Sequence, residues 1–304
     1  MNNNQHTDIM TEQIAKPENT MKRSGVLNTI TQFTRKKPLG AFGAAIIIVF
    51  FIAAIFADIL APFDPLETNY GSMMQPPSFA NWMGTDVFGR DIFSRILYGS
   101  RTAMLIGFTT SFAAATLGAI IGVFSAYQGG TTDLLIQRVM DIILSFPLIV
   151  MALAMVAVLG VGTSTLVLAI VVPMIPRAAR VVRASALSIR ESLYVESAEV
   201  IGATPNRIIY LHMLPNVMGP YLIMLTSFLG QAILLEASLS FIGLGVAEPT
   251  PAWGLMLKGA AEQFIEQAPW MSIFPGVAIS LAVFGFNVFG DALRDVLDPK
   301  LRLR

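Results

Sequence analysis

The segment IILSFPLIVMALAMVAVLGVGTSTLVLAIVVPMIP, residues 142–176, contains no Asp, Glu, Lys or Arg. The hydrocarbon core of a bilayer is about 30 Å thick, so a helix needs about 20 apolar residues to cross it. As a single helix this segment would measure about 50 Å, which is too long for one crossing. Residues 160–164, Gly-Val-Gly-Thr-Ser, favour a tight turn within it. We therefore divide the segment there into two membrane spans.

Four further stretches without charged residues have the length of a membrane span: Pro38–Ala57, Thr102–Thr132, Ile208–Leu235 and Gln267–Gly290. Over the whole chain 54% of the residues are hydrophobic and 13% are charged, whereas a soluble domain carries about 25% charged residues. The sequence therefore predicts an all-α integral membrane protein with six transmembrane helices.

The distribution of basic residues predicts the orientation, because Lys and Arg are retained on the cytoplasmic side. With both termini cytoplasmic, only four of the 20 Lys and Arg residues lie outside: Arg90, Arg95, Arg101 and Lys258. Residues 1–37 are polar and lack the early apolar run of a secretory signal. We therefore expect a cytoplasmic N-terminal tail over 1–37, a first span with an outer loop over 38–101, a core over 102–295 and a cytoplasmic tail over 296–304.

Composition also excludes several classes of site. The formal net charge is zero, which gives no sign of a nucleic-acid partner. The chain has no cysteine, so it contains no disulfide and no thiolate metal site. It contains no phosphate-binding G-x-x-x-x-G-K-[ST] sequence, no H-E-x-x-H and no G-x-S-x-G. We expect neither ATP binding nor hydrolytic catalysis by this chain.

The segment YVESAEVIGATP, residues 194–205, predicts a compact helix–turn–helix in the loop after the fourth span. A helix over residues 190–201 would end at Gly202, which can adopt the left-handed conformation. Thr204 then suits an N-cap and Pro205 the first helical position. Pro215 interrupts the next helix before the fifth span.

This loop resembles the cytoplasmic "EAA" loop of bacterial ABC importer permeases. The pattern of that family is E-A-A, three residues, G, nine residues, I-x-L-P; here it is matched by Glu196-Ser197-Ala198, Gly202 and His212-Met213-Leu214-Pro215. Ser197 replaces the middle Ala and His212 replaces the Ile. His followed by x-L-P-N is similar to the peptide-type branch of the family.

Three other segments resemble the dipeptide, oligopeptide and nickel permeases of the same family. They are residues 84–101, beginning Gly-Thr-Asp-Val-Phe-Gly-Arg-Asp; residues 241–254, which include Phe-Ile-Gly-Leu-Gly and Pro-x-Trp-Gly; and residues 286–299. The resemblance covers roughly residues 30–302, and the extra first span with its long outer loop is similar to the "C" type of permease in this family.

The resemblance implies the MetI-like fold and a role as the transmembrane subunit of an ATP-driven importer of di- or oligopeptides. It implies four kinds of partner: a homologous permease, two ATPase subunits, an external substrate-binding protein and the lipid bilayer. ATP and Mg²⁺ would be bound by the ATPases, with no cofactor in this chain. Coupling to an ATPase would involve the loop near 190–215: Glu196, Ser197, Ala198, Gly202, Ala203, Leu214 and Pro215.

Two polar residues of the fifth span are candidates for the substrate pathway. Glu236 follows Gln231 near the predicted outer end of this span, and ionisable groups within spans tend to face cavities or partners. An interfacial position near the outer headgroups is the alternative for Glu236. Arg177, Arg180 and Arg183 are interpreted as anchors at the membrane surface.

Other interpretations stay open on the sequence alone. Gly118 and Gly122 form a GxxxG pattern that permits close helix packing, either within the chain or against a partner permease. Asp86, Arg90, Asp91 and Arg95 form either a local ion-pair cluster or a docking face for the binding protein. Related permeases transport nickel, glutathione or oligosaccharides, and a different class, the ion-gradient-driven secondary transporters, also uses helices broken by Gly and Pro.

Overall fold

The computed structural model describes residues 33–261, 264 and 266–297. The chain divides into two units, residues 1–38 and 39–304, and only residues 33–38 of the first are described. The predicted tails, 1–37 and 296–304, therefore lie almost wholly outside the described residues. The regular elements of the second unit are helices throughout the described part of the chain, with one isolated β-bridge between Thr85 and Asp91.

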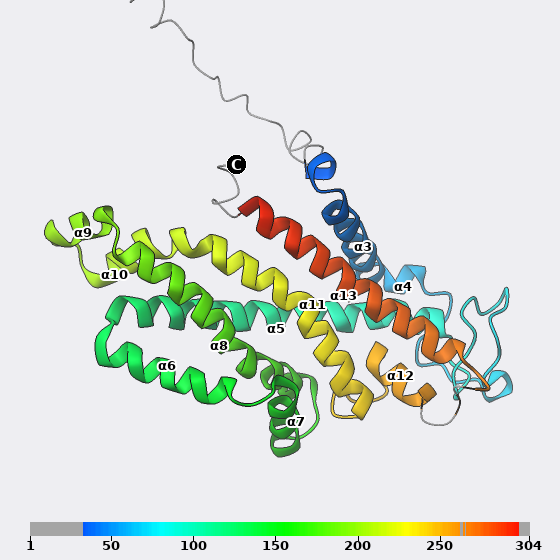
Figure 1. Ribbon diagram of the computed structural model, residues 1–304. Coiled ribbons are helices and arrows are strands. Elements are labelled where there is room, and N and C mark those ends of the chain that lie inside the picture. Colours follow the sequence, from blue (N-terminus) through cyan, green and yellow to red (C-terminus); the bar gives the residue numbers. More distant parts are fainter. Residues whose placement is uncertain (1–32, 262–263, 265, 298–304) are drawn as a thin grey trace, which may run out of the picture. The chain divides into compact units, whose positions relative to one another are not determined.

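Five long helices are joined by shorter ones (Figure 1). The long helices are α3 (Pro38–Ile55), α5 (Ile92–Gln128), α8 (Thr163–Arg190), α11 (Met218–Ile242) and α13 (Trp270–Leu297). The shorter helices are α4 (Ala57–Leu60), α6 (Gly130–Leu144), α7 (Leu148–Leu159), α9 (Leu193–Val200), α10 (Pro205–Arg207) and α12 (Trp253–Ala261). By length and composition five helices of the described chain can cross a membrane, or six if the bent pair α6 and α7 is one span. The all-α, six-span prediction is confirmed in this form.

The third crossing differs from its prediction. The predicted span began at Ile142, but α6 already begins at Gly130, and the chain bends by 87° between α6 and α7. Pro147 lies at this bend, and a proline disfavours the helical conformation in the residue before it. Residues 133–141, predicted as a loop, are therefore helical, and Asp133, Arg138 and Asp141 lie on α6.

The fourth crossing continues beyond its predicted end. The prediction ended this span at Pro176, but α8 passes through Pro173 and Pro176 and ends at Arg190. Two of the arginines that follow Pro176 find partners on α6: Arg180 pairs with Asp141 and Arg183 with Asp133. Neutralisation by a neighbouring helix explains why these charges do not end α8. The three arginines therefore lie on α8 rather than in a loop, and their interpretation as anchors at the membrane surface stays a prediction.

Helix α5 lies at the centre of the bundle and contacts α8, α11, α12 and α13 (Figure 1). Gly118 and Gly122 of α5 face α8: a Cβ on Gly118 would lie 2.5 Å from the Cβ of Ala178 and 2.8 Å from the carbonyl oxygen of Ile175. A Cβ on Gly122 would lie 2.5 Å from the carbonyl oxygen of Ala179. The two helices can therefore approach this closely only because these side chains are absent. The GxxxG pattern thus serves packing within the chain.

A second close contact joins α3 to α13. A Cβ on Gly43 would lie 2.7 Å from the carbonyl oxygen of Gly285. Aromatic side chains continue the contact between α3 and the bundle, with Phe51 against Phe108 of α5 and Phe50 against Trp253 of α12. The extra first span is therefore packed on the core rather than tethered beside it.

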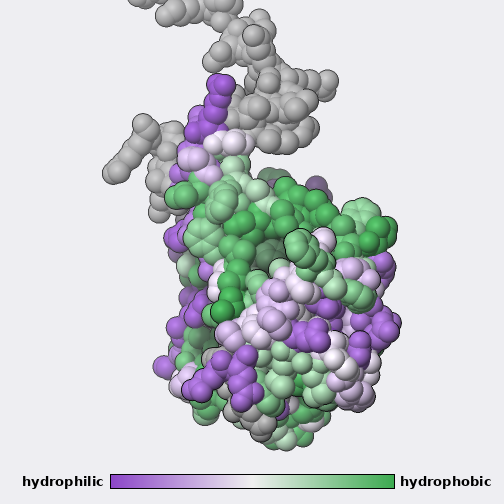
Figure 2. Space-filling model, turned by 90° about the vertical axis from the view of Figure 1, so that its right-hand side faces the viewer, coloured by the Kyte–Doolittle hydropathy of each residue, from purple (hydrophilic) through white to green (hydrophobic). Residues whose placement is uncertain are grey.

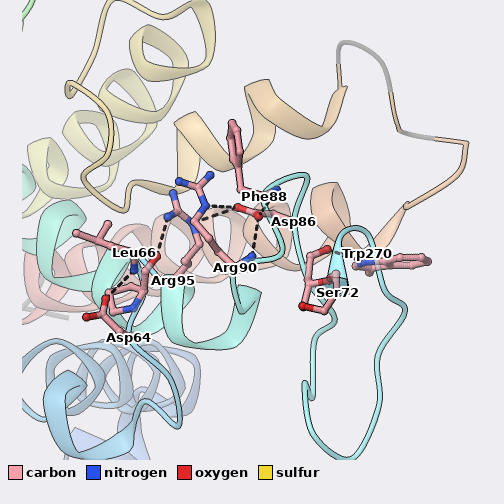
Figure 3. A network of polar contacts seen from close by, with 10 residues as sticks. Asp64, Leu66, Ser72, Asp86, Phe88, Arg90, Arg95 and Trp270 are labelled. Carbon is pink, nitrogen blue, oxygen red and sulfur yellow. Dashed lines mark hydrogen bonds and ion pairs between the residues drawn. The ribbon is translucent and has the colours of Figure 1, made fainter. Parts of the chain in front are cut away.

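The segment between α4 and α5, residues 61–91, forms an outer cap built around Asp86 (Figure 3). Asp86 accepts hydrogen bonds from the backbone N–H groups of Phe88 and Arg90, and its Oδ2 lies 2.6 Å from Arg90 Nε. Arg95, which is 3% exposed, lies 3.8 Å from the same oxygen and donates from Nη1 to the carbonyl oxygen of Pro65. The ion-pair interpretation is confirmed for Asp86, Arg90 and Arg95, whereas Asp91 caps α5 by accepting a hydrogen bond from the N–H of Ser94 at 2.8 Å.

A second polar contact holds α4 against α5. Asp58 accepts hydrogen bonds from Arg101 Nη2 at 3.0 Å and from the Tyr98 hydroxyl at 2.7 Å. The Arg101 guanidinium, with help from Tyr98, holds the pKa of the Asp58 carboxyl below its usual value. Figure 2 looks onto the end of the molecule that carries the cap and α12, and shows hydrophilic residues gathered over its lower part. This end therefore suits water and lipid headgroups.

We predict that Gly118→Ala destabilises the bundle although alanine favours a helix. The added methyl group would overlap Ala178 and the α8 backbone, and overpacking of this kind costs about 1–3 kcal/mol. The measurement is the thermal unfolding midpoint in detergent. Gly219→Ala is the matched control, because no atom lies within 4 Å of a Cβ at that position on α11. Equal midpoints for both variants would contradict the packing role of Gly118.

We also predict that Asp86→Asn loosens the outer cap. Loss of one partner from a buried ion pair costs about 3–5 kcal/mol, since the guanidinium of Arg95 would stay buried without its counter-charge. The cap should become cleavable by protease at least tenfold faster in detergent. Asp64→Asn makes the same change at an exposed position of the cap and should leave the rate unchanged. Equal cleavage rates in both variants would show that Asp86 does not hold the cap.

Candidate functional site

The chain between α8 and α11 forms a compact projection, which we call the elbow (residues 191–217). Helix α9 ends in the left-handed residue Gly202, whose φ is +84°. The N–H of Gly202 donates to the carbonyl oxygen of Glu199, and the N–H of Ala203 to that of Ala198. This pair of bonds is a Schellman motif, which satisfies carbonyl groups at the end of a helix. The predicted turn at Gly202 is confirmed.

The second half of the elbow begins where it was predicted to begin. Thr204 occupies the N-cap position of α10 and Pro205 the first helical position. The chain then widens into a π-helical segment, Ile208–Met213, and tightens into a 3₁₀ turn, Pro215–Val217. Pro215 thus interrupts the regular helix as expected, and α11 begins at the residue that follows this turn, Met218.

One face of the elbow is anchored in the bundle. Val195 and Ala198 of α9 are buried, and Val195 packs in one cluster with Ala126 of α5 and Ala186 of α8. Arg190, at the end of α8, donates to the carbonyl oxygen of Ala126 at 2.9 Å. The end of α5 and the end of α8 therefore form a common base for α9.

A polar clamp closes the elbow on itself. The Nδ2 of Asn216 donates to the carbonyl oxygen of His212 at 2.7 Å and to the Tyr194 hydroxyl at 3.2 Å. The rings of Tyr194 and His212 also lie 6.2 Å apart. His212 therefore packs within the elbow. Over the residues that the structure describes, no group of three or more His, Cys, Asp or Glu side chains could hold a metal ion.

The opposite face of the elbow is exposed and partly apolar. Leu193, Val200 and Ile201 are 80%, 81% and 84% exposed. Such exposure of three large apolar side chains on a rigid projection is typical of a surface that binds another protein. The prediction from the sequence named the charged and small residues of this loop. It missed these three apolar residues, although their positions on and next to α9 can be read from the sequence.

The seven residues predicted for coupling divide between the two faces of the elbow. Glu196, Ser197, Gly202 and Pro215 are exposed, Ala203 and Leu214 are half-buried, and Ala198 is buried in the anchoring face. The structure therefore brings all seven into one projection, in which Ala198 serves the anchor and the exposed residues form the free surface.

The two residues predicted for the substrate pathway are placed in different environments on α11. Glu236 is 1% exposed, and its Oε1 accepts a hydrogen bond from the Ser240 hydroxyl at 2.7 Å. Gln231 is half-buried, and its Oε1 accepts a hydrogen bond from Arg177 Nη1 of α8 at 3.0 Å. Of the two, Gln231 has the accessible side chain. A pathway role for Glu236 stays a prediction.

Two known protein families match the sequence of this chain. Residues 114–303 match the family described as binding-protein-dependent transport system inner membrane component. Residues 32–77 match the N-terminal transmembrane domain of oligopeptide transport permease C. These two matches together cover the first span, part of the outer cap and most of the core.

Curated relatives match over most of their length. The chain is 43% identical over 268 residues to the dipeptide transport system permease protein DppC of Alkalihalophilus pseudofirmus, covering 88% of each chain. It is 39% identical over 269 residues to the glutathione transport system permease protein GsiD of Escherichia coli O6:K15:H31, again covering 88% of each chain. Both relatives are named as permease proteins of transport systems.

A solved structure shares the fold. The inward-facing MetNI methionine ABC transporter contains a chain that superposes with a TM-score of 0.56 at 18% identity. The match covers 68% of this chain and 98% of that chain. The MetI-like core is thereby established. With these matches and its membrane-spanning helices, this multi-pass inner-membrane protein belongs to the binding-protein-dependent transport permeases, in the peptide-type branch of the ABC importers.

Proposed function

We propose that this chain is a transmembrane permease subunit of an ATP-driven importer of di- or oligopeptides. The observation that carries the proposal is the elbow, a rigid projection with an exposed apolar surface on a membrane bundle. The names of the relatives supply the substrate class: one is a dipeptide permease and another a glutathione permease. Glutathione is itself a small peptide, so both names support the same chemical class.

The proposed assembly contains a second, homologous permease, two ATPase subunits and an external substrate-binding protein. The elbow sits in a groove of one ATPase, with Leu193, Val200 and Ile201 buried in the contact and Glu196 and Ser197 at its polar margin. ATP and Mg²⁺ bind in the ATPases, and this chain needs no cofactor of its own. Both termini and the elbow face the cytoplasm, in agreement with the excess of Lys and Arg in these segments.

The proposed mechanism is a movement of the elbow with the ATPase. A ligand shifts a conformational equilibrium only when it contacts the two states differently. Closure of the ATPase dimer around ATP changes the contacts of the exposed face of the elbow. Because its anchored face packs on the ends of α5 and α8, both helices receive the displacement directly, and the pore between the two permeases opens outward.

We predict that Gly202→Asp uncouples ATP hydrolysis from uptake while the chain still inserts in the membrane. At φ +84° an L-residue is strained by roughly 1–2 kcal/mol, and the new carboxylate would lie on the ATPase-facing surface. The expected result is an uptake rate at least tenfold lower in proteoliposomes containing the full complex. Copurification of the ATPases measures whether the defect lies in assembly or in coupling.

Gly130→Asp is the matched control for this experiment. Gly130 also has a positive φ, +54°, and no atom lies within 4 Å of a Cβ at either glycine. The control introduces the same residue, with the same charge, at a positive φ at the start of α6, outside the elbow. Normal uptake and normal ATPase binding in Gly202→Asp would refute the coupling role of the elbow.

A further inference from the structure

Arg177 of α8 carries a positive charge that no described acidic side chain neutralises. Its neighbours are paired: Arg180 and Arg138 with Asp141, and Arg183 with Asp133. Within residues 33–261, 264 and 266–297, Arg177 has no ion pair, and its side-chain hydrogen bond goes to the neutral amide of Gln231. One strong donor group is therefore positioned but left without a counter-charge.

This guanidinium lies at the depth of the apolar core. Ala178, the next residue, contacts Gly118 of α5. Gly118 lies ten residues before Gln128, the last residue of α5, which corresponds to about 15 Å along the helix. The side chain of Arg177 extends from this level to Gln231 of α11. Leu229 and Ile233, two residues before and after Gln231, pack at Gly107 of α5. The guanidinium thus lies between the levels of Gly107 and Gly118, inside the charge-free stretch of α5.

The surface around Arg177 is polar and accessible. Arg177 is exposed, and α11 carries Ser227, Gln231 and Ser238 on one stripe at spacings of four and seven residues, all exposed or half-buried. Leu234, also exposed, is the apolar residue of this stripe. An arginine at this depth is unfavourable against lipid, so such residues face water-filled cavities or polar partners. The stripe and Arg177 therefore mark the face of this subunit that does not contact lipid.

We infer that Arg177, held in place by Gln231, binds the carboxylate of a peptide during its passage through the permease. The inference rests on the proposed function and names the chemical group that this subunit recognises. One N–H of the planar guanidinium is used by Gln231, which leaves further donors for a carboxylate, the group that arginine binds in two-pronged geometry. Every unmodified peptide carries such a carboxylate at its C-terminus. Glu236, the acidic candidate on the same helix, is closed off by burial.

The test compares a peptide with and without its carboxylate. Proteoliposomes containing the two permeases and the ATPases receive the binding protein saturated with trialanine or with trialanine amide. For each peptide the uptake rate of a variant is divided by that of the unaltered complex, so that the preference of the binding protein cancels. Arg177→Gln should lower uptake of the free acid about tenfold, in line with the loss of one charge-assisted hydrogen bond, and leave uptake of the amide within twofold.

A second variant keeps the test decisive if Arg177→Gln fails to assemble. Gln231→Glu places a carboxylate beside Arg177, where it competes with the peptide for the guanidinium, and should also lower uptake of the acid but not of the amide. Arg177→Lys should retain most of the acid uptake. Arg138→Gln is the control, since it removes an exposed arginine whose partner Asp141 keeps Arg180; both peptides should enter as before.

Three outcomes would overturn the inference. Equal losses for the acid and the amide would show a structural or lipid-binding role for Arg177. Loss of the partner permease in Arg177→Gln and Gln231→Glu, with recovery in Arg177→Lys, would show that the carboxylate belongs to the partner subunit. Absence of ATP-dependent uptake by the unaltered complex would overturn the proposed function itself, and the inference with it.

Discussion

The close approach of α5 and α8 at Gly118 and Gly122 is the contact on which the rest of the structure depends. Any side chain at these positions would push α8 away from α5 by contact with its backbone. Three features use this short distance: the shared cluster that buries Val195 of the elbow, the bond from Arg190 to the end of α5, and the packing that sets the depth of Arg177. Glycine permits this close approach. In a membrane such an approach stabilises the helix pair, because packing, rather than expulsion of water, drives helix association there.

The elbow could be predicted from the sequence because its signals are local. A left-handed glycine, an N-cap position and a proline at the first helical position lie within four residues, and each acts through its own backbone. The ends of the spans were harder to predict. Charge-free runs mark where lipid contact is possible, but α6 and α8 carry charges into the bundle because Asp133 and Asp141 meet Arg183 and Arg180 across the interface. Such pairing depends on a contact between helices that sequence spacing does not reveal.

The candidate pathway residues show the same limit. Gln231 and Glu236 are five residues apart and both polar, and residue type alone does not show which of them is accessible. Five residues on a helix correspond to about 500° of rotation, so the two side chains point to different faces of α11. Glu236 lies in the core beside Ser240, whereas Gln231 contacts Arg177 at the accessible face. Burial, and not chemical type, separates them, and burial follows from how α11 packs on α5 and α13.

Arg177 and the base of the elbow lie on the same continuous helix. Helix α8 is continuous between Arg177 and Arg190. Its buried alanines have single-methyl side chains that cannot change position without the backbone: Ala178, Ala179 and Ala186. A displacement imposed on α9 therefore changes the position of the Arg177 guanidinium relative to α11, on which Gln231 is fixed by separate packing. The bond between Arg177 and Gln231 spans these two helices, so it is the contact through which a carboxylate ligand and a movement of the elbow would affect one another.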